Sequence, residues 1–353
     1  MATLAACSGD NTDEQTPQAD GSIRFEAEAP LFTRSLIDTD AKLRELSDGF
    51  GVFAYYTEDN LWDDASSPIP NFMYNQRVTY AATSWQYSPV KYWPNDDTKK
   101  YVSFFAYAPY SSAYSAATAV NASNEPLISY TRTNNVNPSS QSDLLYASQT
   151  DCYKTMPAGY GTVTGRVPFH FRHALAAIEF KVRRKDDTGE VIYLSTTPTK
   201  TPSQDTQILT LTPTAAINTR GTFNLGTAEW DSTSLNTSTP TISYLEDSSS
   251  SPERHDINSS LLSTGTGVTA TTDATAHALT SYTPNLLLLM PQESETTFSF
   301  TLHYTIGGTE KAPSGTITFA DGLAMGTKYT VVFVIDGGEV ESYLLRAKEA
   351  EQW

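Results

Sequence analysis

Short apolar stretches recur along the whole chain, and turn-forming residues separate them. Three clear examples are "GFGVFAYY" at 49–56, "QILTLTP" at 207–213 and "KYTVVFVID" at 328–336. Each has the length of a β-strand, and Ser, Thr, Gly and Pro fill the joints between them. Many short strands at regular spacing predict an all-β protein built from sandwiches, because each strand must bury its apolar face against another layer.

The strand pattern restarts at Val167 with "VPFHFRHALAAIEFKVRR", which predicts two sandwich domains in tandem. A chain of 353 residues is also long for one small core. We expect an acidic, disordered tail over 1–21, an N-terminal domain over 22–165 and a C-terminal domain over 166–353. Within them, 35–48 is expected to be a charged connector with a short helix, and the Ser/Thr-rich stretch 231–282 an elaborated surface loop.

Charge and cysteine content exclude several classes of protein. The net charge of −17 argues against a nucleic-acid partner, because few cations are available to neutralise phosphates. Two cysteines do not make a disulfide framework. No apolar run approaches the length needed to span a bilayer, and "NLLLLM" at 285–290 has only the length of a strand.

The stretch "SIRFEAEAPLFTRS" at 22–35 alternates and then breaks. Ile23, Phe25, Ala27 and Ala29 fall on one face, which predicts a half-buried strand. Pro30 ends the pattern. A lone arginine, Arg34, then follows in a loop-like stretch directly after a strand that should help to close a core.

The extreme N-terminus contains Leu4-Ala5-Ala6-Cys7, which resembles the motif that precedes lipidation in bacterial lipoproteins. An acidic stretch without bases follows it. We therefore expect Cys7 to carry the lipid. The apolar segment that normally precedes such a motif is almost missing, so the alternative is that Cys7 is the remnant of a chain boundary.

Residues with catalytic or metal-binding chemistry form no recognisable constellation. On a strand, His170 and His173 point to opposite faces, so we expect one packed and one exposed rather than a shared metal. Cys152 lacks any local signature of a thiol nucleophile, and Asp63-Asp64 lacks the ligand spacing of a calcium loop. We predict no catalytic residue, no metal and no cofactor.

Three tryptophans lie close together in the first half of the chain. Core packing and a platform for a sugar are the two readings, and core packing is favoured. The three tryptophans are Trp62, Trp85 and Trp93.

The string "FGVFAYY…NFMYNQRV…WQYSPVKYWPNDDTKKYVSFFAYAPY" closely resembles the fimbrillin-like proteins of Bacteroidales, the type V pilins. The resemblance continues through "DLLYA" at 143–147, "VPFHFRHALAAIEFKV" at 167–182 and "KYTVVFVI" at 328–335. It implies two transthyretin-like β-sandwich domains, export as an outer-membrane lipoprotein, and assembly with other pilin subunits into cell-surface fimbriae. It implies no enzymatic activity.

The same resemblance gives the first strand a provisional role. In these pilins that strand completes the N-terminal sandwich until an arginine-specific protease cuts just beyond it. Here the matching cut lies between Arg34 and Ser35, so 22–34 is the expected provisional strand and cleavage loop. Arg24 lies within the strand and Arg44 lies far downstream, so both suit the protease less well.

A C-terminal strand donated to the next subunit, head to tail, is the other implied feature. The candidate donor residues are Val340, Ser342 and Leu344. Ala350 stands where relatives commonly have valine, and "SYLLRAKEAEQ" also favours a helix, so strand and helix both remain open. The roles of stalk, tip and anchor subunit are likewise open. The alternative function is a surface lipoprotein or tip adhesin that does not polymerise and binds glycans on host or bacterial surfaces.

Overall fold

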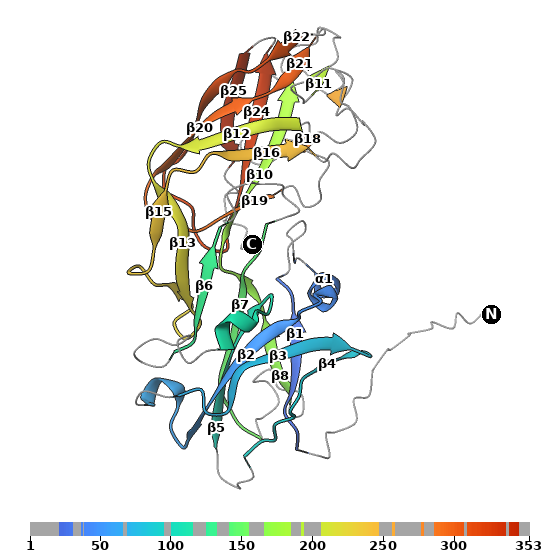
Figure 1. Cartoon of the computed structure of the whole chain (residues 1–353), viewed down its shortest axis with the longest axis vertical. Coiled ribbons are helices and arrows are strands. Elements are labelled where there is room, and N and C mark those ends of the chain that lie inside the picture. Colours follow the sequence, from blue (N-terminus) through green and yellow to red (C-terminus); the bar gives the residue numbers. More distant parts are fainter. Residues whose placement is uncertain are drawn as a thin grey trace, which may run out of the picture.

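A computed structural model describes most of the chain, and strands dominate it (Figure 1). Among the described residues there is one short α-helix, α1 (Asp40–Glu45), with two 3-10 turns, η1 (Trp62–Asp64) and η2 (Ser112–Ser115). None of the described helices is long and apolar enough to cross a membrane. The described residues are 21–30, 37, 39–65, 69–94, 100–115, 125–132, 141–154, 166–184, 192–193, 206–246, 256–257, 277–278, 286–306, 309–336 and 339–345.

One end of the molecule contains a six-stranded sheet with a two-stranded sheet packed on it (Figure 1). The larger sheet has the order β4-β3-β2-β5-β7-β9, and the smaller one pairs β1 with β8 in parallel. Between them lies the first core, a cluster that includes Phe25, Phe50, Val52, Phe104 and Phe169. The strands are β1 (Arg24–Glu28), β2 (Phe50–Glu58), β3 (Met73–Ala81), β4 (Ser84–Gln86), β5 (Tyr101–Ala108), β7 (Leu145–Cys152), β8 (Arg166–His170) and β9 (Arg172–His173).

The other end contains a four-stranded and a five-stranded sheet that pack face to face. Their orders are β16-β12-β20-β23 and β18-β10-β24-β25, with β19 also paired to β10. The second core lies between them and includes Phe180, Phe300 and Phe333. The strands are β10 (Ala176–Arg184), β12 (Thr206–Pro213), β16 (Ile242–Glu246), β18 (His277–Ala278), β19 (Leu286–Leu289), β20 (Thr296–Leu302), β23 (Ser314–Phe319), β24 (Lys328–Asp336) and β25 (Glu339–Leu345).

A third group of buried residues, here called the middle cluster, joins the two ends. It includes Phe53, Phe105, Phe223 and Leu288. It lies beside a small sheet in which β6 (Leu127–Thr131) pairs with β13 (Ile217–Asn224), strands far apart in the sequence. The remaining short strands are β11 (Ile192–Tyr193), β14 (Glu229–Trp230), β15 (Asn236–Ser238), β17 (Asp256–Ile257), β21 (Tyr304–Ile306) and β22 (Thr309–Lys311).

The middle cluster explains why some strands are apolar without alternation. In β2, Val52 and Ala54 face the first core, whereas Phe53 and Tyr55 face the middle cluster. A strand that is covered on both faces has no side exposed to solvent, so its sequence contains few polar residues. In "NLLLLM", the leucines of β19 divide between the second core and the middle cluster in the same way.

The all-β prediction is confirmed, and so is the short helix within 35–48. The helix begins where the side chain of Thr39 accepts a hydrogen bond from Lys42 N at 3.2 Å, an ordinary N-cap. The polar stretch 231–282 differs in part from the expected loop, because β16 pairs with β12 and buries Ile242 in the second core.

Residues on either side of the expected boundary at 165/166 share one core. Strand β8 follows that boundary, yet Val167 and Phe169 pack in the first core against β1. Strand β6 precedes the boundary, yet it pairs with β13. The chain therefore leaves the first core at β6, returns to it at β7 and enters the second core only at β10.

Candidate functional site at the first strand

Strand β1 lies across the open face of the six-stranded sheet and is bound along one edge by β8. The register is parallel, with Phe25 opposite Val167 and Ala27 opposite Phe169. At its start, Ile23 N donates to Lys91 O at 2.8 Å. Strand β1 is therefore an edge strand, paired along its whole length with β8 on one side and, among the described residues, only near its start on the other.

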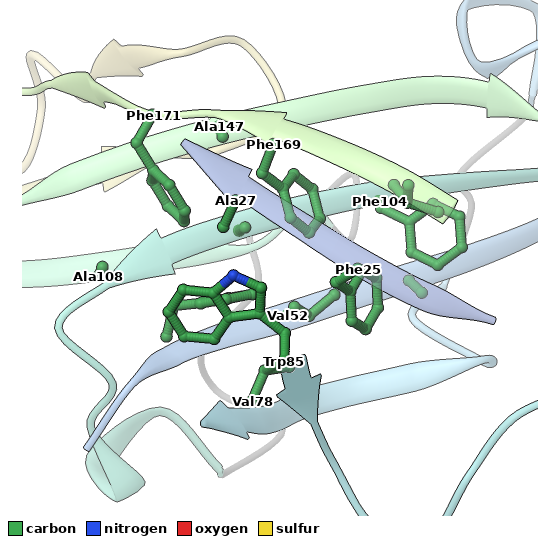
Figure 2. Close-up of a cluster of buried hydrophobic side chains, with 14 of the residues drawn as sticks. Phe25, Ala27, Val52, Val78, Trp85, Phe104, Ala108, Ala147, Phe169 and Phe171 are labelled. Atoms are coloured by element: carbon green, nitrogen blue, oxygen red, sulfur yellow. The ribbon is translucent and has the colours of Figure 1, made fainter. Parts of the chain in front are cut away.

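The apolar face of β1 is almost completely buried. Exposed fractions are 1% for Ile23, 2% for Phe25, 5% for Ala27 and 7% for Ala29. Figure 2 shows Phe25 and Ala27 on β1 among side chains that come from the larger sheet and from β8. These four residues confirm the alternation predicted from the sequence. Burial of Ile23 and Phe25 alone contributes about 1.5–3 kcal/mol each to the stability of the first core.

Phe25 is the centre of this contact (Figure 2). Its ring centroid lies 5.3 Å from Tyr87, 5.4 Å from Phe169 and 5.8 Å from Phe104. The pair with Tyr87 is tilted, the pair with Phe104 is edge-to-face and the pair with Phe169 is stacked, and such pairs add to the energy of burial. Tyr87 also donates its hydroxyl to Ile23 O at 2.8 Å, and burial raises the pKa of that phenol to about 12, so it remains a donor at neutral pH.

The polar face of β1 carries one ion pair and one carboxylate–histidine contact, which is an ion pair only when the histidine is protonated. Glu26 Oε1 lies 3.1 Å from Arg166 Nη1, and Glu28 Oε2 lies 2.8 Å from His170 Nδ1. Both partners of the second pair are more than half exposed. Exposed pairs contribute at most about 1 kcal/mol, so they fix register more than they hold the strand.

The end of β1 is fastened to the helix that follows it. Ala29 N donates to Asp40 Oδ1 at 2.8 Å, and Asp40 is the first residue of α1. The expected cleavage residues Arg34 and Ser35 fall between these two anchors and lie outside the described residues. A cut there would leave β1 attached to the protein only through non-covalent contacts.

A family model described as fimbrillin-like matches residues 33–344. The chain belongs to the fimbrillin-like family. The resemblance found in the sequence is therefore confirmed, as is the expectation of a structural rather than enzymatic protein, because the family is a structural one. The matched region includes Arg34 and leaves out β1.

Two individual proteins are similar to this fimbrillin-like chain, one in sequence and one in fold. It is 32% identical to the fimbrium subunit Fim1C of Phocaeicola vulgatus over 185 residues, which is 50% of this chain and 47% of that protein. The chain thus spans about half the length of that curated relative. A crystal structure of a fimbrial protein from Bacteroides vulgatus superposes with a TM-score of 0.59 at 20% identity, covering 93% of this chain and 99% of the other. That superposition indicates a shared fold.

The candidate donor segment of the fimbrillin-like chain forms β25, an edge strand paired only with β24 among the described residues. Val340 packs against the second core, and Ser342 Oγ donates to Thr316 O at 3.2 Å. Leu344 lies opposite Val331 in the register. A strand through Leu345 replaces the helix that its propensity allowed, because pairing to β24 outweighs local preference.

Other residues considered in the sequence take structural roles. His173 is buried with its Nδ1 3.0 Å from Asp143 Oδ2, whereas His170 is exposed, so the prediction of one packed and one exposed histidine is confirmed. No cluster of metal ligands occurs among the described residues. Burial raises the pKa of the Cys152 thiol to about 12, which leaves it protonated and unreactive. Cys7 lies outside the described residues.

The tryptophans support the core-packing reading. Trp85 and Trp93 belong to the first core with exposed fractions of 8% and 5%, and Trp62 packs against the middle cluster. Sequence reasoning missed two contacts of β1, those with the segment 87–93 and with Asp40. A local pattern carries no signal for contacts between segments so far apart.

Proposed function

We propose that this chain is a type V pilin subunit whose strand β1 is provisional. The observation that carries the proposal is the position of β1: its apolar face completes the first core, yet it pairs as a strand only with β8 among the described residues. Arg34 follows it in the sequence, and the family match begins at residue 33. Proteolysis after Arg34 then frees β1 to be exchanged for a strand of another subunit.

The fold supports two transthyretin-like sandwich domains in tandem, one around each core. We place their boundary near residue 174 rather than at 165/166, because β8 and β9 pack with the N-terminal strands. In this reading the acceptor groove belongs to the N-terminal domain and the donor strand β25 to the C-terminal one. Partners are other pilin subunits arranged head to tail, together with an arginine-specific maturation protease.

Substitution of Arg34 with alanine should abolish maturation at this position. A trypsin-like protease requires the basic side chain, and the segment between β1 and α1 is the expected site of nicking. The measurement is N-terminal sequencing of fimbriae from cells, where wild-type subunits should begin at Ser35. Arg44→Ala is the control and should be processed normally, because Arg44 lies in α1.

Cutting of the Arg34→Ala variant at the same position and rate would show that the assignment is wrong. An uncleaved, lipid-bearing wild-type chain that binds glycans would instead support the surface-adhesin alternative.

Cys7→Ala should release the precursor from membranes. We propose that Cys7 is lipidated and tethers the precursor to the outer membrane, from which processed subunits reach the cell-surface fimbrium. A multiply acylated cysteine holds a protein firmly, whereas an unacylated one holds nothing. The gene is expressed with its native signal, and the protein is assayed in membrane and soluble fractions. Full partition of Cys7→Ala with membranes would disprove lipid anchoring at this residue.

A further inference from the structure

The two ends of the molecule meet in the middle cluster, and both sides of the boundary near residue 174 contribute to it. Phe53, Phe105 and Tyr146 come from the N-terminal side, and Phe223 and Leu288 come from the C-terminal side. The rings of Tyr146 and Phe223 meet across the joint, with centroids 4.9 Å apart. Domains of one chain usually move relative to one another unless the interface between them is large and apolar. The middle cluster therefore limits the motion of the two ends.

Strand β6 crosses this joint, because it precedes the boundary but pairs with β13 of the C-terminal side (Figure 1). It is also tied to the N-terminal domain, since Tyr114 donates its hydroxyl to Ser129 O and Tyr130 donates its hydroxyl to Ser142 O. Among the described residues, β6 pairs only with β13, so a single line of backbone bonds joins the two ends here. Such a line resists separation of the domains better than it resists rotation about itself.

A second polar contact across the joint is made by one side chain, that of Gln141. Its Nε2 donates to Leu286 O at 2.6 Å, and its Oε1 accepts from Leu288 N at 2.7 Å. In a strand, the backbone groups of residues i and i+2 point to the same side. Strand β10 pairs with the other side of β19. The amide of Gln141 therefore takes the place of a neighbouring strand along β19.

This contact is specific for one arrangement of the two domains. Leu286 and Leu288 are buried, and a buried backbone donor or acceptor that loses its partner is costly. The segment that carries Gln141 is itself fixed at the boundary, because Ala174 N donates to Leu144 O at 2.8 Å and Trp230 Nε1 donates to Ala174 O at 2.9 Å. Rotation of one domain against the other would break both bonds of Gln141 together.

We propose that Gln141 is a clamp that sets the angle between the two sandwich domains. Its consequence for fimbriae rests on the proposed function. Strand β19 belongs to the same sheet as β25, through β10 and β24, whereas the acceptor groove lies in the N-terminal domain. The clamp thus fixes the donor strand relative to the groove, and the same angle recurs at every subunit of a filament. Gln141 is a positioning residue for filament stiffness.

The test compares Gln141→Met with the wild type as intact, uncleaved protein. Methionine keeps about the length and volume of glutamine but can make neither hydrogen bond. Gln86→Met is the matched control, because the Gln86 amide donates to Ala81 O at 3.2 Å within the β3–β4 hairpin and takes no part in the joint.

Spin labels on the two domains report the angle between them. They are attached at Glu45→Cys and Glu310→Cys, two exposed positions, in a Cys7→Ala background, where the buried Cys152 stays unlabelled. Double electron–electron resonance should give one narrow distance distribution for the wild type and for Gln86→Met. The distribution of Gln141→Met should be about twofold wider, because the domains can then rotate about the β6–β13 pairing.

Hydrogen exchange separates a loosened joint from general unfolding. The Leu288 amide should exchange about tenfold faster in Gln141→Met, because Gln141 is its acceptor, whereas amides of the first core should keep their wild-type rates. If Gln141→Met does not fold, Gln141→Glu takes its place, since it can still accept from Leu288 N but cannot donate to Leu286 O. A distribution as narrow as that of the wild type in the folded variant would overturn the clamp, and so would a broad distribution in the wild type.

Filaments test the consequence separately. Polymers of cleaved Gln141→Met should have a persistence length about twofold shorter than wild-type polymers in electron micrographs, with Gln86→Met unchanged. Equal persistence lengths despite a widened distance distribution would refute the role in stiffness and leave the clamp. Absence of wild-type polymers would refute the proposed function, and the spin-label and exchange measurements on the uncleaved protein would still decide whether Gln141 holds the joint.

Discussion

Replacement of Phe25 by alanine should lower the free energy of unfolding of the first core by about 3–5 kcal/mol. The side chain is 2% exposed and lies among four aromatic rings, so its loss leaves a cavity that a packed sheet cannot close. Hydrogen exchange of the β8 amides measures the effect where it should be greatest, because β8 pairs with β1. The same substitution should speed the departure of β1 once Arg34 has been cut.

The matched control is Glu28→Ala on the same strand. Its carboxylate forms an exposed pair with His170, so the expected cost is below about 1 kcal/mol. A Phe25→Ala protein with β8 exchange close to that of Glu28→Ala would show that β1 does not close the first core, and the provisional role would lose its physical basis.

Cleavage after Arg34 should convert a stable monomer into a subunit that forms SDS-resistant ladders. The cut leaves β1 in place at first, since the burial of Ile23 and Phe25 holds it without a covalent link. When β1 departs, β8 and the 87–93 segment border an empty apolar groove, which favours β-augmentation by an extended segment. Insertion of β25 from another subunit is head to tail and does not close on itself, so it yields a filament.

Three samples test this expectation by electron microscopy and gel laddering: intact protein, cleaved protein, and cleaved protein truncated after Gly338. Only the second should polymerise, because truncation removes β25. Polymers from the truncated form would rule out the C-terminal donor. Monomers from the cleaved full-length form, with β1 shown to have left, would indicate a tip or anchor subunit.

Local sequence patterns predicted much of the strand content of this chain. The alternation of Ile23, Phe25, Ala27 and Ala29 gave the buried face of β1 because side-chain direction in a strand has a period of two. The family resemblance then implied a provisional role for that strand, which is part of the proposed function. Runs such as "NLLLLM" were read correctly as strands, although their burial on both faces follows from the middle cluster, which no local window contains.

Tertiary structure alone decided which strands meet. No local sequence pattern indicates that β6 pairs with β13 or that β16, within the polar stretch, joins the second core. Local propensity also left open whether the segment of β25 is a strand or a helix. The placement of Lys91 and Asp40 at the two ends of β1 is of the same kind. Pairing between distant segments depends on the summed burial of whole faces and on loop closure, whereas a residue pattern records only which side of its own strand is apolar.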